Sequence, residues 1–254
     1  LITFTFSEDP GSTFTWNGSA GDVSLVNGTL SALAGTGLTR TATFLPTQGI
    51  TGGNATITVS NNLYADTAGN LGAGNTLDGL LLNTSPATLM DVQISSAIGV
   101  QNNALNAGDV VTVTAHFSEA QTLNVASGSP TVALQIGSST VNATYASGAG
   151  TANLLFTYTI QAGQTDANGI AIGANALSLN GSTLQDPRAN TTTLLAPGTA
   201  DNSSFTVDTT APFLSITSNV GQLKSGETAN ITFTFSEDPG NTFVWNGSTG
   251  DITL

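Results

Sequence analysis

The sequence predicts an all-β protein built from tandem antiparallel β-sandwich domains. Three observations support this prediction: apolar and polar residues alternate, Asn-Gly pairs recur between the alternating runs, and one long segment is repeated. Alternation with a period of two is typical of antiparallel strands that bury one face, and no segment has a helical period. Short strands separated by frequent turns are typical of a sandwich.

The strands predicted most clearly are four alternating segments. They are Ala55–Val59, Val111–Phe117, Leu154–Ile160 and Ile231–Phe235. In each, Val, Ile, Leu, Phe, Tyr or Ala falls on one face and mostly polar residues fall on the other. Asn27-Gly28 and Asn180-Gly181 lie between predicted strands, and Asn-Gly adopts the positive φ angles that tight hairpins require.

An internal repeat predicts the domain organisation. Residues 231–254 repeat residues 2–25 and differ from them at only five of 24 positions. A weaker repeat, at an offset of 118, aligns Phe117-Ser-Glu119 with Phe235-Ser-Glu237. Two domain types therefore alternate. We expect residues 1–85 to form a domain lacking its first strand, residues 86–207 a complete domain, and residues 208–254 the N-terminal part of a further domain of the first type.

The composition excludes several classes of function. The chain has sixteen Asp and Glu residues but only three Lys and Arg residues, which gives a net charge of −13. Nucleic-acid binding needs clustered basic residues, so it is not expected here, whereas divalent cations are favoured. The chain has no Cys, which excludes disulfides and thiolate metal sites. No apolar run approaches the roughly 20 residues that span a bilayer, and we expect any export signal to lie outside this sequence.

Two sets of residues resemble a known family. The first is Val207-Asp-Thr-Thr-Ala-Pro212, followed by a strand, Leu223-Lys-Ser-Gly-Glu227 and Phe-Ser-Glu. The second is Tyr64-Ala-Asp66-Thr-Ala-Gly69-Asn70. Together they resemble the tandem bacterial Ig-like repeats of giant surface adhesins, and the resemblance covers nearly the whole chain. It implies Ig-like β-sandwiches, an extracellular location at the cell surface or in secreted form, and calcium at the domain junctions.

Acidic and amide residues near the linkers are the candidate calcium ligands, because Ca²⁺ takes six to eight oxygen ligands. We expect Asp208, Glu237 and Asp186 to meet at the junction between residues 86–207 and 208–254, and Asp66, Asn70 and Glu119 to meet at the earlier junction. Asn83 stands in the earlier linker where Asp208 stands in the later one, so the earlier site should be weaker or empty. Acidic residues near turns also commonly just cap a bend or solvate a surface.

Neither an enzyme nor a cofactor other than calcium is predicted. The single histidine, His116, aligns with Thr234 on the outward face of a strand, and no Gly-x-Ser-x-Gly motif is present. Trp16 and Trp245 alternate with Phe14 and Phe243, so core packing is favoured over a sugar-binding platform.

The leading hypothesis for function is an extracellular structural or adhesive spacer, stiffened by calcium, that projects an adhesin. Its partners would be Ca²⁺ and neighbouring repeats of the same or an identical chain. The first alternative is a subunit of an extracellular filament or sheath, in which residues 213–219 of one copy complete the domain at residues 1–85 of another. The second alternative is a carbohydrate-binding module that uses Trp16 and Trp245.

Overall fold

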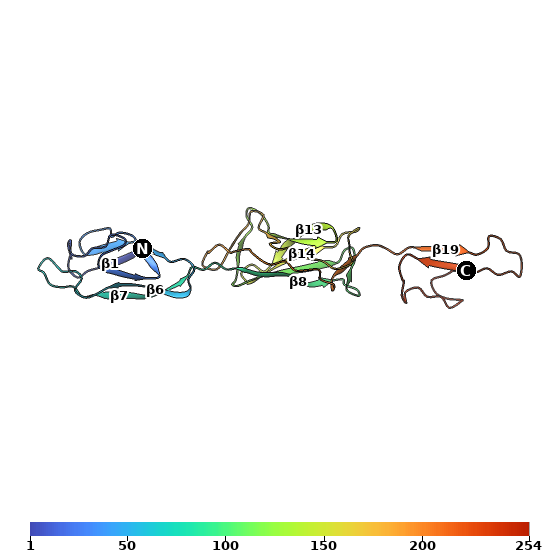
Figure 1. The fold of residues 1–254 in the computed structure, drawn as a ribbon, viewed down its shortest axis with the longest axis horizontal. Helices are drawn as coiled ribbons and strands as arrows, with labels where there is room; N and C mark the ends of the chain where they lie inside the picture. Colours follow the sequence, from blue (N-terminus) through green and yellow to red (C-terminus); the bar gives the residue numbers. More distant parts are fainter. Residues whose placement is uncertain (254) are drawn as a thin grey trace.

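A computed structural model describes residues 1–253 and arranges them as three β-structured bodies in a row (Figure 1). We call residues 1–85, 86–207 and 208–253 the first, second and third domains. Every regular element in these residues is a strand. The described part of the chain contains no helix that could cross a membrane. The predicted all-β class with Ig-like sandwiches is confirmed.

The first domain has seven strands in two layers. They are β1 (Ile2–Thr5), β2 (Val23–Val26), β3 (Gly28–Leu30), β4 (Thr39–Ala42), β5 (Phe44–Pro46), β6 (Thr51–Val59) and β7 (Asn75–Asn83). One layer contains the pairs β1–β4 and β3–β5, and the other is the sheet β2-β6-β7. Phe14, Leu30 and Ile57 are buried between the layers.

The second domain contains one large and two small sheets, and its last strand extends one residue past 207, to Asp208. Its strands are β8 (Leu89–Ile98), β9 (Ala104–Leu105), β10 (Val110–Phe117), β11 (Thr122–Asn124), β12 (Thr131–Ile136), β13 (Ser139–Ser147), β14 (Asn153–Thr159), β15 (Thr165–Asp166), β16 (Leu177–Ser178), β17 (Thr183–Gln185) and β18 (Thr206–Asp208). A six-stranded sheet runs β16-β12-β13-β14-β10-β8, and the smaller sheets are β15-β18-β9 and β11-β17. Strands β9 and β18 pair in parallel, whereas β8 and β14 flank β10 antiparallel.

The predicted alternation determines which side chains enter this core. In β10, Val111, Val113 and Ala115 are fully buried, and in β14 the same holds for Leu154 and Phe156. Burial of each of these Val, Leu and Phe side chains stabilises the fold by about 1.5–3 kcal/mol. Asn180 and Gly181, between β16 and β17, have the predicted positive φ angles of 48° and 91°, but the two strands belong to different sheets and do not form a hairpin.

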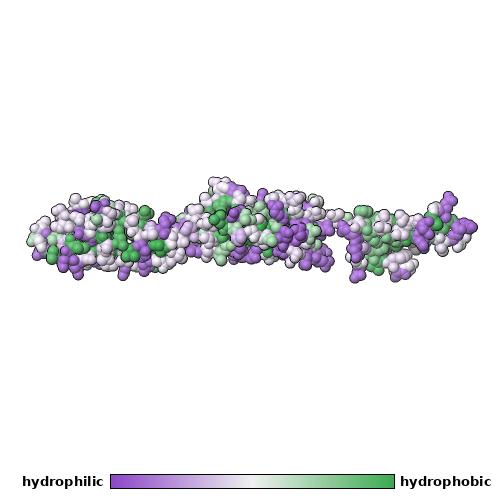
Figure 2. Space-filling view, in the orientation of Figure 1, coloured by the Kyte–Doolittle hydropathy of each residue, from purple (hydrophilic) through white to green (hydrophobic). Residues whose placement is uncertain are grey.

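The third domain consists of the hairpin-like pair β19 (Leu214–Ser218) and β20 (Ile231–Phe235), followed by irregular chain. We expected Ile231–Phe235 to bury one face, yet Ile231 is 51% exposed. The reason is that residues 208–253 contain no second sheet to cover this face. Figure 2 shows hydrophobic residues gathered on the surface of the third domain.

Truncation of a core leucine should destabilise the second domain. Leu154→Ala removes a fully buried side chain and leaves a cavity, so the free energy of unfolding should fall by about 2–5 kcal/mol. Hydrogen exchange of the β10 and β14 amides measures this change within one domain. Leu195→Ala makes the same chemical change at a side chain that is 73% exposed, and it should alter stability by less than about 0.5 kcal/mol. Equal effects of the two substitutions would contradict the assigned core.

Candidate metal centre at the domain junctions

Both linkers are attached to the preceding domain by a threonine hydroxyl. Thr84 Oγ1 accepts a hydrogen bond from the Ile50 N–H at 3.0 Å and donates one to the Thr47 carbonyl at 2.6 Å. Thr209 makes the equivalent two bonds with the backbone of residues 163–164, each 2.9 Å long. The residue immediately before this threonine is Asn83 in one linker and Asp208 in the other.

Both linkers are also attached to the following domain in the same way. The Thr88 N–H donates to Ser118 Oγ at 3.0 Å, and the Ser118 N–H donates to the Thr88 carbonyl at 2.9 Å. Phe213 and Ser236 exchange the same two bonds at 2.8 and 2.9 Å. Each serine belongs to a Phe-Ser-Glu segment, so a glutamate follows the attachment point in both domains.

The loop that follows β17 brings Asp186 to the junction between the first and second domains. Asp186 is 1% exposed, and its Oδ1 accepts hydrogen bonds from the N–H groups of Arg188 (2.8 Å) and Asn190 (2.9 Å). Its Oδ2 accepts a third bond from Asn190 Nδ2 at 2.7 Å. Ala189 has a φ of 65°, an angle that favours glycine, and Gly69 occupies the equivalent place in the Asp66–Asn70 loop.

A buried glutamine joins this loop to the segment that carries Glu119. Gln121 is fully buried, its Nε2 donates to the Glu119 carbonyl at 2.9 Å, and its Oε1 accepts from Thr192 Oγ1 at 2.6 Å. Thr192 lies two residues after Asn190, so the two loops are held at the same end of the sandwich. Gln121 is a positioning residue that the sequence did not single out.

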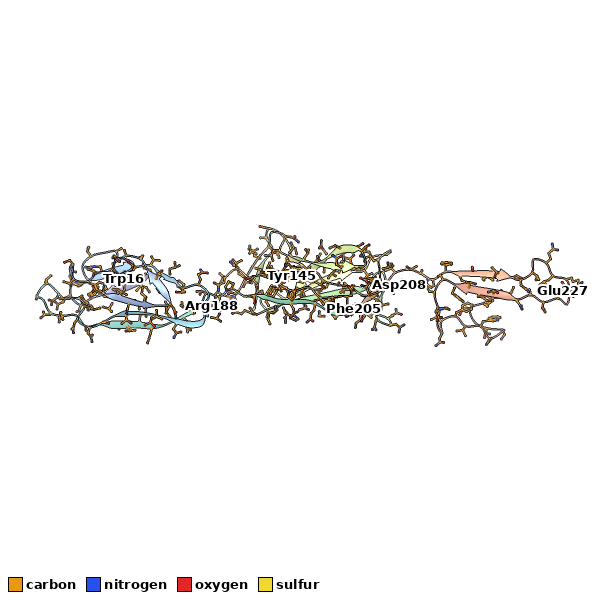
Figure 3. All side chains as sticks on the ribbon, in the orientation of Figure 1. Trp16, Tyr145, Arg188, Phe205, Asp208 and Glu227 are labelled. Atoms are coloured by element: carbon orange, nitrogen blue, oxygen red, sulfur yellow. The ribbon has the colours of Figure 1, made fainter. Side chains whose placement is uncertain are left out.

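Asn83 connects these loops to the first domain. Its carbonyl accepts a hydrogen bond from Asn190 Nδ2 at 3.2 Å, and its Nδ2 lies 3.5 Å from each carboxylate oxygen of Glu119. Those two distances exceed the usual N–H···O range. Its Oδ1 is buried without a hydrogen-bond partner among residues 1–253. Figure 3 shows Arg188, from the Asp186 loop, at this junction.

The residues at this junction fit a hard cation. Carboxylate and amide oxygens are the ligands Ca²⁺ prefers, and the unpartnered Oδ1 of Asn83 is such an oxygen. Asp186 keeps unused acceptor capacity, because its two oxygens offer about four lone pairs to three donors. No group of three or more His, Cys, Asp or Glu residues close enough to hold a metal occurs within the described residues. Backbone carbonyls and water would therefore have to complete the ligand set.

Hydrogen bonding keeps Asp186 ionised despite its burial. Burial alone would raise its pKa, but the side chain and backbone N–H of Asn190, together with the backbone and charge of Arg188, lower the pKa below its ordinary value. The exposed Asp66 has its pKa lowered for a similar reason, chiefly by the side chain of Asn70. Both loops therefore hold a carboxylate in its charged form.

The expected grouping of Asp186 with Asp208 and Glu237 is wrong. Asp186 lies beside Asn83 and Glu119, whereas Asp208 ends β18, which pairs with β15. Figure 3 labels Arg188 and Asp208 at opposite ends of the second domain. The Asp-x-x-x-Asn loop therefore belongs at the N-terminal end of its own domain, beside the linker that precedes that domain.

The expected grouping of Asp66 and Asn70 with Glu119 is wrong for the same reason. Strands β6 and β7 pair from Thr51↔Asn83 at one end to Val59↔Asn75 at the other, and the Asp66–Asn70 loop connects the Val59 end. It therefore lies at the opposite end of the first domain from Asn83. Glu8, which sequence reasoning did not select, lies at the same end as this loop. Phe6 is two residues before Glu8 and Tyr64 is two residues before Asp66, and the centroids of their rings are 5.2 Å apart.

Asp208 and Glu237 occupy the positions of Asn83 and Glu119 at the second junction. Both are exposed, and Asp208 Oδ1 accepts a hydrogen bond from the Thr210 N–H at 3.0 Å. No hydrogen bond joins Asp208 to Glu237 within residues 1–253. Residues 208–254 contain no counterpart of the Asp66–Asn70 loop.

The remaining candidate residues have structural contacts. His116 Nδ1 lies 2.7 Å from Asp91 Oδ1 on the neighbouring strand β8. Trp16 packs against the core of the first domain, and its Nε1 donates to the Leu30 carbonyl at 3.3 Å. These contacts account for both side chains without a ligand.

Comparison with known proteins gives one similarity. Residues 1–79 match the family model of a bacterial Ig-like domain. No match is found among curated proteins or among solved structures. Because residues 231–254 repeat residues 2–25, part of the third domain is similar to the matched region, and the match supports bacterial Ig-like repeats.

Asp186 should make the second domain sensitive to acid. Its pKa in the folded state lies below the unfolded value of about 3.9, so its stabilising effect is complete above that pH and is lost as the pH falls through the folded pKa. The difference in unfolding free energy between the wild type and Asp186→Asn should therefore be largest near neutral pH and shrink toward pH 2. Hydrogen exchange of β10 amides across this range measures it.

Asp78→Asn is the matched control, because it removes the same charge from an exposed position on β7. Its effect on β10 should be small at every pH. A difference between wild type and Asp186→Asn that grows on acidification would contradict the assigned role of the loop.

Proposed function

We propose that this chain is a span of extracellular spacer repeats from a bacterial surface adhesin, with junctions stiffened by Ca²⁺. The observation that carries the proposal is the recurrence of the same linker attachments at both junctions. In each, a threonine hydroxyl holds the linker to the domain before it, and a serine of Phe-Ser-Glu holds it to the domain after it. The role of such repeats is to hold a binding region away from the cell.

The attachments leave little freedom between domains. Only residues 85–87 separate Thr84 from Thr88, and residues 210–212 separate Thr209 from Phe213. Pro86 and Pro212 each fix one φ angle within these short segments. Tandem domains with short, restrained linkers suit an elongated spacer, as the row of bodies in Figure 1 illustrates.

A cation would reduce the repulsion between the negative charges at the junctions. Glu119 and Asp186 place two carboxylates at the first junction in a chain of net charge −13. A bound Ca²⁺ would supply the positive charge that lets these carboxylates and the Asn83 oxygen lie close together. Asp208 replaces Asn83 at the second junction and adds one carboxylate from the linker, whereas residues 208–254 supply no counterpart of the Asp186 loop, so two carboxylates lie at each junction of this chain. No catalytic role is part of the proposal.

Calcium should bind weakly and stabilise the chain. Calcium sites of extracellular modules have Kd values of about 10⁻⁴–10⁻³ M. At about 10 mM Ca²⁺ such affinities correspond to roughly 1.4–2.7 kcal/mol of added stability per site. Isothermal titration of chelator-treated protein should give a Kd in this range, and calorimetry should show a melting temperature that falls when chelator is added.

Glu119→Gln and Asp186→Asn should each weaken binding at the first junction by about tenfold or more. Asp78→Asn is the control, because it removes an equal charge away from the junction, and it should bind like the wild type. Identical melting curves with calcium and with chelator would refute the calcium part of the proposal.

Calcium should also narrow the range of orientations between the first and second domains. The chain has no Cys, so spin labels can be placed at Leu45→Cys and Leu195→Cys, two side chains that are 65% and 73% exposed. The distribution of distances between the labels, measured by double electron–electron resonance, should be narrow with calcium and broader with chelator. In a Glu119→Gln background the distribution should stop responding to calcium.

A broad distribution that is indifferent to calcium would contradict stiffening at this junction. Combined with normal calcium binding, that result would assign the cation to stability alone. The titration and the distance measurement therefore test separate parts of the proposal.

A further inference from the structure

Arg188 is the only Lys or Arg residue of the second domain, and its charge has no partner among the described residues. The other two basic residues of the chain, Arg40 and Lys224, form ion pairs with acidic neighbours at 3.3 and 3.4 Å. No ion pair within residues 1–253 includes Arg188, which is exposed. The second domain contains six acidic residues, namely Asp91, Asp109, Glu119, Asp166, Asp186 and Asp201.

The backbone of Arg188 is held beside the Asp186 carboxylate. Its N–H donates to Asp186 Oδ1 at 2.8 Å, and Asn190 closes the loop with two further hydrogen bonds to the same carboxylate. Pro187 fixes the φ angle before Arg188, and Ala189 after it has a φ of 65°. Only the side chain of Arg188 is free to move, so its charge stays within one side-chain length of Asp186.

The loop that carries Arg188 lies against the first linker. Asn190 Nδ2 donates both to Asp186 Oδ2 at 2.7 Å and to the Asn83 carbonyl at 3.2 Å. The Glu119 carboxylate lies 3.5 Å from Asn83 Nδ2. Figure 3 shows Arg188 at the boundary between the first and second domains. A positive charge is therefore present at the same junction as both carboxylates of the candidate metal centre.

The Asp66–Asn70 loop has the same hydrogen bonds without the positive charge. Asp66 Oδ1 accepts from the N–H groups of Ala68 and Asn70 at 2.8 and 2.9 Å, and its Oδ2 accepts from Asn70 Nδ2 at 2.8 Å. Ala68 therefore stands where Arg188 stands in the second domain. Because the turn forms with alanine at this position, its geometry does not require a basic side chain.

The charge of Arg188 acts on Asp186. Burial raises the pKa of Asp186, whereas the hydrogen bonds from Asn190 and from the Arg188 N–H lower it, and the Arg188 charge lowers it further. The pKa of Asp66 is lowered by the side chain and backbone of Asn70, with no contribution from a neighbouring charge. A cation that stabilises a carboxylate in this way also repels a second cation that approaches the same carboxylate.

We propose that Arg188 is a built-in counter-charge of the first junction, which partly replaces Ca²⁺ there and lowers the affinity of the junction for it. The inference rests on the calcium binding proposed above. Without Ca²⁺, the guanidinium reduces the repulsion between Asp186 and Glu119. With Ca²⁺, two positive groups lie near each other, so binding is weaker than the oxygen ligands alone would give. The order of this junction thereby depends less on the calcium concentration.

A calcium titration of the full chain, followed by nuclear magnetic resonance, tests the effect on affinity. The side-chain amide signals of Asn83 report on the first junction separately from the second. Arg188→Gln removes the charge and keeps much of the side-chain length. Its Kd should be about three- to tenfold lower than that of the wild type at about 0.1 M salt, where charges interact over roughly 10 Å. In about 1 M KCl this range falls to roughly 3 Å, and the two Kd values should converge.

Three further variants show whether the charge is responsible. Arg188→Lys keeps the charge and should bind Ca²⁺ like the wild type. Arg188→Ala reproduces the loop of the first domain and should bind like Arg188→Gln. Lys224→Gln removes an equal charge from the third domain, where the lysine side chain is 83% exposed, and should leave the Kd of the first junction unchanged.

Hydrogen exchange in chelator tests the counter-charge without calcium. The β10 amides of Arg188→Gln should exchange about two- to fivefold faster than those of the wild type, because an unscreened repulsion destabilises the second domain. Arg188→Lys should restore the wild-type rate. The same substitution is thus expected to weaken the domain without Ca²⁺ and to tighten the binding of Ca²⁺, a combination that a simple loss of packing does not produce.

The possible outcomes separate this inference from the proposed function. If the wild type binds Ca²⁺ and Arg188→Gln has an equal or higher Kd, the inference is overturned and the proposed function stands. Exchange in chelator that is equally fast or slower in Arg188→Gln overturns it as well. If the Asn83 signals of the wild type ignore about 10 mM Ca²⁺, well above the Kd of extracellular modules, calcium binding and this inference are both refuted.

Discussion

The double attachment of each linker is the constraint on which the rest of the structure depends. Thr84 and Thr209 attach each linker to the domain before it, and Ser118 and Ser236 attach it to the domain after it. Because the serine contact fixes where the first strand starts, it also determines the register of that strand and the position of the following glutamate. These hydrogen bonds thus place the first strand and the following glutamate relative to the domain before the linker.

The two domain types hold the glutamate segment by different means. In the second domain Gln121 joins the Glu119 segment to Thr192, in the irregular chain after Asn190. In the first domain buried Pro10 stands at the position of Gln121, and Thr13 Oγ1 lies 2.6 Å from the carbonyl oxygens of both Pro10 and Ala65, between which its single O–H is shared. Both solutions tie the glutamate segment to the loop that carries the aspartate. The shared geometry is therefore preserved although the residues that produce it have changed.

The strands were predictable from the sequence, but the grouping of the junction residues was not. Burial of one face imposes a period of two, which Val113 and Phe156 show directly. The sequence also indicated that Asn83 and Asp208 are equivalent, because each precedes a threonine and a nearby proline. It did not reveal at which end of the sandwich Asp186 lies, since that depends on how many strands cross the domain between Glu119 and Asp186. The predicted burial of Ile231–Phe235 was too high. Alternation shows which side chains share one face of a strand, but it does not show whether a second sheet covers that face.

The difference between Asn83 and Asp208 has a consequence for a longer array of such domains. With two domain types in alternation, hinges with an amide and hinges with a carboxylate also alternate. If Ca²⁺ binds these hinges as proposed above, a falling concentration of divalent cations would empty the amide hinges before the carboxylate hinges. The array would then bend at every second hinge, and its elastic unit would be a pair of domains instead of one.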